Sequence, residues 1–174
     1  MGLAMFLERE VYIGANYKHN KITGTIDLFQ DGEPLNLSTD NITEINYRVG
    51  YWRKANHIHQ WFVQEVQDGI DECQRSYVGN DKIRELYELC LLVFDKLDDA
   101  HMTAETQKTY GGESYEVEVY DNKEKIKELL PTTCGFFFGS CTIDKYYKQD
   151  IQDTIEILEP LLDCEDSIFY QASW

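Results

Sequence analysis

The sequence predicts a single α+β domain over residues 1–174, with a small antiparallel sheet packed against three to four helices. Two observations lead to this fold class. Apolar, aromatic and β-branched residues partly alternate with polar ones along the first fifty residues, which is typical of half-buried strands. Farther on, apolar residues recur at helical spacing. No repeat, linker or low-complexity tract divides the chain.

The first strands are expected over residues 3–13, 22–29 and 42–49. In the last of these, Ile45, Tyr47 and Val49 fall at a period of two, which places them on one face of a strand. Asp31 and Gly32 follow the second strand and supply the residue types of a tight turn.

Two helices are expected next, over residues 53–67 and 80–98. The first carries an apolar face made of Ile58, Trp61, Phe62 and Val66. The second is the clearest helix of the chain, with Asn80 as its expected N-cap. Its predicted apolar stripe is Ile83, Leu86, Tyr87, Cys90, Leu91, Phe94 and Leu97.

The last third of the chain predicts shorter elements. Residues 115–120 read as an edge strand, and Asp121 with Glu124 resembles a capping box that opens a short helix before Pro131. The run Gly135-Phe-Phe-Phe-Gly139 is expected to add a buried strand to the sheet. A long helix is expected from about residue 142, followed by a terminal strand over residues 167–174. The outer face of this helix is expected to be acidic and comprises Asp144, Asp153, Glu156 and Asp163.

Composition narrows the class of function. The formal net charge of −16 repels phosphate backbones, so we expect no direct binding to nucleic acid or to an anionic membrane. The chain has no signal-peptide pattern and no apolar run of membrane-spanning length. Its five cysteines form no CxxC pair, which favours reduced, inert thiols in a cytoplasm. We expect no cofactor. We also expect no metal, because His57 and His59 would point to opposite sides of a helix and could not bind one ion there.

Acidic residues are missing from three stretches of this acidic chain, residues 11–26, 45–64 and 129–143. A bound anion needs a place where neighbouring carboxylates do not cancel the local positive potential. We therefore expect the three stretches to fold together into one concave, positively biased pocket. The structural alternative is that Trp52, Trp61 and Phe62 are core residues and that Arg53 and Lys54 pair with acids elsewhere.

The predicted ligand-binding residues have the following roles. Arg53, Lys54 and Arg48 would hold phosphate, and Tyr51 or Trp52 would stack on a base. Asn56, His57 and His59 would contact a sugar or base edge, and Ser140 would donate a hydrogen bond. Participation of the histidines predicts binding that changes between about pH 5.5 and 7.5. Sequence analysis predicts no catalytic residue.

Three segments of the chain resemble a family of small proteins encoded by bacteriophages and prophages. They are Met1-Gly-Leu-Ala-Met-Phe-Leu7, Tyr51-Trp-Arg-Lys-Ala-Asn-His-Ile-His-Gln-Trp-Phe62 and Gly135-Phe-Phe-Phe-Gly-Ser140. The resemblance covers most of the chain and implies no catalytic residues. It implies an accessory protein of the host bacterial cytoplasm that acts on host defence or metabolism by binding.

These observations favour a nonenzymatic counter-defence protein that binds an anionic, nucleotide-like small molecule. Two alternatives remain open. The acidic helices would imitate nucleic acid and inhibit a host defence nuclease, as anti-CRISPR proteins do, or a small enzyme would use Cys134 or a histidine. The expected partners are accordingly a nucleotide-derived molecule or a host defence protein, and the oligomeric state is left open.

Overall fold

A computed structural model describes residues 2–13, 28–34, 42–108 and 112–174. Its fold is α+β, as predicted. The main sheet is antiparallel, with the strand order β4-β1-β8-β5. Its strands are β1 (Ala4–Tyr12), β4 (Glu44–Arg53), β5 (Ser76–Val78) and β8 (Ser167–Ser173). The expected N-terminal strands at residues 3–13 and 42–49 and the expected terminal strand are therefore confirmed.

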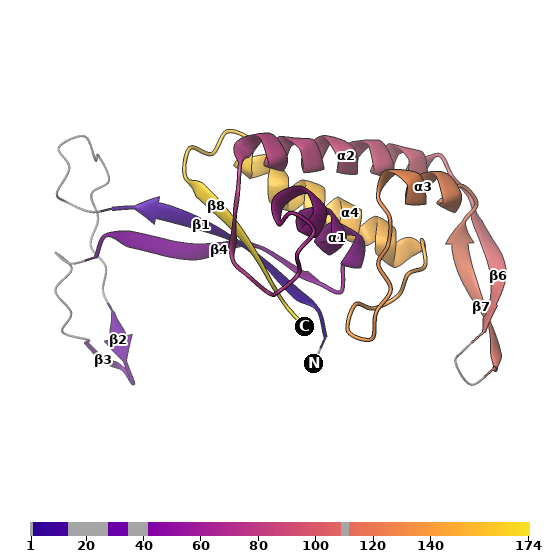
Figure 1. Ribbon diagram of the computed structural model, residues 1–174, viewed down its shortest axis with the longest axis horizontal. Coiled ribbons are helices and arrows are strands. Elements are labelled where there is room, and N and C mark those ends of the chain that lie inside the picture. The colour runs from indigo at the N-terminus through magenta and orange to yellow at the C-terminus, as the bar shows by residue number, and fades with distance from the viewer. Residues whose placement is uncertain (1, 14–27, 35–41, 109–111) are drawn as a thin grey trace.

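Alternation along the central strands decides which face of the sheet is buried. Met5 and Leu7 of β1 are fully buried, and so are Ile168 and Tyr170 of β8. Phe6 lies between the two buried β1 residues in sequence and is only partly buried on the other face. The buried face is covered by helices, as Figure 1 shows.

Three helices form that cover: α1 (Asn56–Val66), α2 (Asn80–Asp98) and α4 (Lys145–Leu158). The short helix α3 (Lys123–Leu129) and a 3-10 turn, η2 (Glu159–Leu161), complete the helical part. The bounds of α2 match the sequence expectation, and its stripe is largely confirmed. The exceptions are Leu91, which is exposed, and Val93, which is buried in its place. These two positions lie two residues apart, or about 200° around the helix, so they point to nearly opposite sides of it.

Two hairpins lie at opposite ends of the molecule (Figure 1). The first joins β2 (Phe29–Gln30) to β3 (Glu33–Pro34) through Asp31 and Gly32, both of which have positive φ angles. The predicted turn is confirmed, because Asp-Gly suits a two-residue hairpin of this kind. The expected strand at 22–29 lies almost wholly outside the described residues. The second hairpin pairs β6 (Met102–Lys108) with β7 (Ser114–Tyr120), and sequence analysis predicted only β7.

Three local predictions are wrong. Residues 53–55 belong to the end of β4 and a turn, so the first helix begins at Asn56. Gly79, not Asn80, is the N-cap of α2, and the Asn80 side chain donates to the Cys164 carbonyl. The helix α3 has no side-chain cap.

The run Gly135–Gly139 is a loop rather than a strand of the main sheet. Its only ladder contact among the described residues joins the two glycines to each other. Phe136 is fully exposed while Phe138 packs against the core. A strand would place successive phenylalanine rings on opposite faces of a sheet. In this short closed loop the rings do not follow that alternation.

Gly50 should be essential for packing β4 against α4. A Cβ at Gly50 would lie 2.7 Å from Ile157 Cγ2 and 3.2 Å from Leu7 Cβ. We expect Gly50→Ala to lower the free energy of unfolding by about 1–3 kcal/mol through overpacking, as measured by chemical denaturation. The control Ala104→Val adds carbon at an exposed strand position and should leave stability nearly unchanged. Equal stabilities for both variants would show that this contact does not limit packing.

Candidate functional site

A pocket of about 270 Å³ opens where β4 ends, α1 begins and α4 begins. Two of the three acid-free stretches, residues 45–64 and 129–143, contribute to its wall. Most of the remaining stretch, residues 11–26, lies outside the described residues. The pocket is lined by Arg53, Lys54, Asn56, His57, Ser140, Thr142, Asp144, Tyr146, Tyr147 and Asp150.

A sharp backbone turn at Lys54 separates the strand from the helix. Lys54 has a φ of 62°, its amide donates to the Leu3 carbonyl at 3.0 Å, and its own carbonyl accepts from the Asn56 amide at 2.8 Å. The loop before α4 approaches this turn closely, because a Cβ at Gly139 would lie 3.0 Å from Lys54 Cβ. Only glycine permits that approach at the φ of 92° found there.

The Asn56 side chain joins the start of α1 to the loop. Its Nδ2 donates to the carbonyls of Phe138, at 3.1 Å, and Ser140, at 2.7 Å. Its Oδ1 accepts from the Thr133 amide at 3.0 Å. Both amide hydrogens are thus used within the protein, and the side chain is 1% exposed. Asn56 therefore positions the pocket wall, and its amide hydrogens are already used there rather than free for a sugar or base.

A disulfide between Cys134 and Cys141 closes the same loop. This corrects the expectation of reduced, buried thiols, because Cys134 is exposed and neither sulfur is free. The loop is also bonded at its middle, where Leu3 donates to the Phe137 carbonyl, and at its end, where Thr132 donates to the Cys141 carbonyl. The loop is consequently held at several points, which presents Ser140 to the pocket in a defined position.

The ends of the two cationic side chains of the pocket lie close to the same residue, Gly2. Lys54 Cε and Arg53 Nη2 lie 3.3 and 3.8 Å from the position that a Cβ at Gly2 would occupy. Both side chains are exposed. Within the described parts of the chain, neither forms an ion pair with a carboxylate. The alternative that Arg53 and Lys54 serve surface ion pairs is therefore not supported there.

His57 is 2% exposed, and its ring stacks on Tyr147 with 4.0 Å between ring centroids. Its Nε2 is buried without a hydrogen-bond partner. Burial lowers the pKa of His57 to about 3, so the imidazole is neutral at physiological pH. The predicted change in binding between about pH 5.5 and 7.5 is accordingly wrong for His57.

Helix α4 contributes two carboxylates that sequence analysis did not assign to the site. Asp144 caps the helix by accepting from the amides of Tyr146, at 2.8 Å, and Tyr147, at 3.1 Å. Asp150 is partly buried, and no described residue donates a hydrogen bond to its carboxylate. The pocket therefore has mixed charge, with two carboxylates beside the two cations that were expected there.

The pKa of Asp150 is raised to about 7, chiefly by burial and further by the charges of Asp153 and Asp144. A half-buried carboxylate without a donor is unfavourable for the fold. Such groups concentrate at functional sites, where a ligand supplies the missing partner. A sequence signal for Asp150 existed, because it lies one turn after the aromatic residue Tyr147 in the expected helix.

Three other predicted binding residues do not reach the pocket. Trp52 is 3% exposed and its indole donates to the Thr154 hydroxyl at 2.9 Å, so it offers no face to a base. Tyr51 and Arg48 lie on the opposite face of the sheet, where both contact the ring of Phe6. The alternation of β4 explains this division, since Tyr51 and Trp52 must point to opposite sides.

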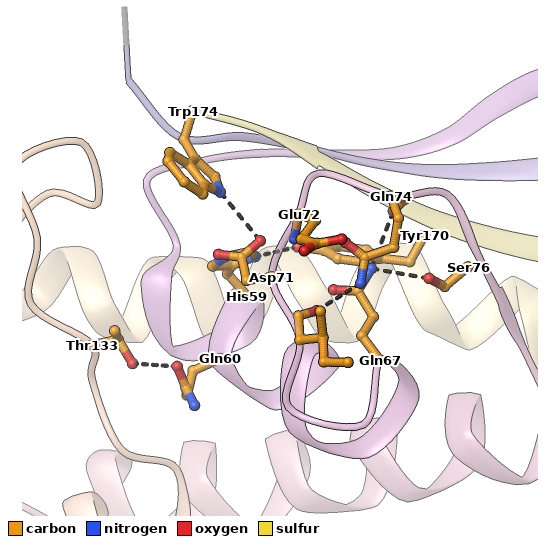
Figure 2. Close-up of polar contacts among 11 residues, drawn as sticks. His59, Gln60, Gln67, Asp71, Glu72, Gln74, Ser76, Thr133, Tyr170 and Trp174 are labelled. Atoms are coloured by element: carbon orange, nitrogen blue, oxygen red, sulfur yellow. Dashed lines mark hydrogen bonds and ion pairs between the residues drawn. The ribbon is translucent and has the colours of Figure 1, made fainter.

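His59 also lies elsewhere, in a buried polar network (Figure 2). Its two ring nitrogens are 2.7 Å from the Tyr170 hydroxyl and 3.0 Å from an Asp71 carboxylate oxygen. The indole of Trp174 donates to the other Asp71 oxygen at 3.2 Å. This network joins α1, the following loop and the end of β8, so His59 has a structural role.

No group of three histidine, cysteine or acidic side chains among the described residues is placed to hold a metal ion. No helix in the same residues has both the length and the apolar character needed to cross a bilayer.

Comparison of the chain with protein-family models, with curated proteins and with solved structures found no match.

Asp150 should lower stability at neutral and alkaline pH. Its pKa is about 7 in the folded chain and about 4 when unfolded, so the folded state loses stability as the pH rises between these values. We expect Asp150→Asn to raise the free energy of unfolding by about 1–3 kcal/mol at pH 8 and to change it little at pH 4. Chemical denaturation at both pH values measures this.

The control is Glu156→Gln, which removes an exposed charge from the same helix and should have a small effect at both pH values. A pH-independent effect of Asp150→Asn would show that the carboxylate is not held in an unfavourable environment.

Proposed function

We propose that this protein binds an anionic, nucleotide-like small molecule in the pocket at the start of α1, without transforming it. The observation that carries the proposal is the convergence of Arg53 and Lys54 beside the pocket with no carboxylate partner in the described chain. Two free cations at one place match a phosphate, whose oxygens accept the forked hydrogen bonds of a guanidinium.

The build of the pocket supports tight positioning of such a ligand. Asn56 and the Cys134–Cys141 disulfide hold the loop wall in place before any ligand arrives. Binding then loses less free energy in ordering the protein. The volume of about 270 Å³ lies just below the range of about 300–1,000 Å³ common for ligand pockets. A mononucleotide with its phosphate at the open side suits this size better than a dinucleotide.

Binding is favoured over catalysis by the state of the candidate catalytic groups. Cys134 is bonded to Cys141 and does not line the pocket. The Tyr147 hydroxyl donates its proton to the Leu130 carbonyl at 2.8 Å, so this proton is already used in a hydrogen bond. His59 is committed to Tyr170 and Asp71.

The biological setting that we propose is a phage accessory protein in the host bacterial cytoplasm. Sequestering a nucleotide-derived signal there would blunt a host defence that depends on it. This setting rests on the resemblance of three sequence segments to phage and prophage proteins. The disulfide is the feature that suits a reducing compartment least.

A second candidate is inhibition of a host nuclease by imitation of nucleic acid. The observation that favours it is the set of exposed carboxylates on α2, α4 and the adjoining 3-10 turn, which pack together. Within the described chain, Glu88, Asp95, Glu156 and Glu159 form no ion pair. Unpaired charges of one sign attract a basic groove.

The small-molecule proposal predicts that Arg53 carries binding. Calorimetric titration with a panel of nucleoside monophosphates and cyclic nucleotides should reveal a ligand, and Arg53→Ala should weaken it roughly 10- to 100-fold. Arg48→Ala is the matched control, because Arg48 lies on the same strand but outside the pocket. No heat from any nucleotide, or equal losses in both variants, would refute the proposal.

The imitation proposal predicts a different sensitivity. Replacing Asp153, Glu156 and Glu159 by lysine should abolish salt-sensitive co-purification with a host nuclease, while Arg53→Ala should not affect it. Retention of the complex by the triple variant would rule this candidate out.

A further inference from the structure

The part of the pocket wall that α4 contributes carries groups that an anion would not use. The Asp150 carboxylate is partly buried and receives no hydrogen bond from the described residues. His57 lines the same pocket, and its ring is stacked against Tyr147. A phosphate would be repelled by Asp150, so this part of the pocket requires a portion of the ligand that donates hydrogen bonds.

A carboxylate is best satisfied by two neighbouring N–H groups, which it accepts as a pair. Guanine presents such a pair, because its ring N1–H and its exocyclic 2-amino group lie on one edge. Adenine presents one amino group next to an acceptor nitrogen, and an acceptor facing Asp150 would be unfavourable. Hypoxanthine has the ring N–H alone. The chemistry of Asp150 therefore distinguishes guanine from the other purines.

A stacking surface is available for the base. The Tyr146 ring lines the pocket and is 68% exposed, and its backbone amide is held by the Asp144 cap. Aromatic faces stack on bases of any identity. Tyr146 thus offers the base-stacking surface that was expected of Trp52. Sequence analysis did not assign this α4 residue to the site.

We propose that the ligand is a guanine mononucleotide, with its phosphate at Arg53 and Lys54, its base against Tyr146 and its N–H edge on Asp150. This identification rests on the proposed small-molecule function and deepens it. Both cations and the unpartnered acid are then used by one molecule of a size that the pocket admits. Asp150 also gains the donors whose absence makes its burial unfavourable.

The test uses two ligands that differ by one amino group, guanosine monophosphate and inosine monophosphate. Calorimetric titration of the intact protein should show guanosine monophosphate binding roughly 10- to 100-fold more tightly, the effect of one hydrogen bond to a charged acceptor. Adenosine monophosphate should bind more weakly than guanosine monophosphate as well.

Asp150→Asn then provides the matched variant. An asparagine amide accepts one N–H and donates to one carbonyl, so it suits xanthine, which has a carbonyl where guanine has its 2-amino group. The variant should lose the preference for guanosine over inosine monophosphate and gain affinity for xanthosine monophosphate. The control Asp153→Asn changes a neighbouring acid that does not line the pocket and should keep the wild-type preference.

The outcomes separate this inference from the function beneath it. Equal binding of the guanosine and inosine nucleotides, with sensitivity to Arg53→Ala, would overturn guanine recognition and leave the anion site standing. An unchanged preference in Asp150→Asn would also overturn it. Absence of binding for every nucleotide would overturn both proposals.

Discussion

The candidate site depends on one buried amide. Asn56 donates twice to the loop before α4 and accepts once from its start, across sequence separations of 77 to 84 residues. Together with the bond that the Thr133 hydroxyl donates to Gln60 Oε1 at 2.7 Å, these bonds fix the distance between the start of α1 and the loop. The turn at Lys54, the Gly139 approach and the pocket between them all follow from that attachment.

The pocket also concentrates groups that oppose folding. His57 is buried with an unpartnered nitrogen, and the pKa of Asp150 is raised to about 7. Most other acids in the described parts of the chain are exposed or paired, and their carboxylates remain hydrated. Unfavourable groups gathered at one concave place are more consistent with a binding site than with a feature of the fold, since a purely structural pocket would be more stable with apolar residues.

Periodicity predicted much of the fold and only part of the site. The helix over residues 80–98 and the strands at both ends of the chain were predictable because their apolar residues recur at a helical spacing or alternate with polar ones. Arg53, Lys54, His57 and Ser140 were correctly brought together by the absence of acids around them. Arg48, Tyr51 and His59 lie in the same acid-free stretch, but their side chains lie outside the pocket. The composition of a stretch does not show where each side chain points.

The sequence by itself determined the α+β class, the main apolar faces and the presence of cations in an acid-free stretch near residue 53. Only the tertiary structure decided which groups meet those cations. Asp144 and Asp150 enter the pocket because α4 packs against the same sheet face as α1, and Trp52 leaves it because its side of β4 faces the core. The physical reason is that local patterns set which side of an element is buried, whereas a pocket is made by elements far apart in the chain.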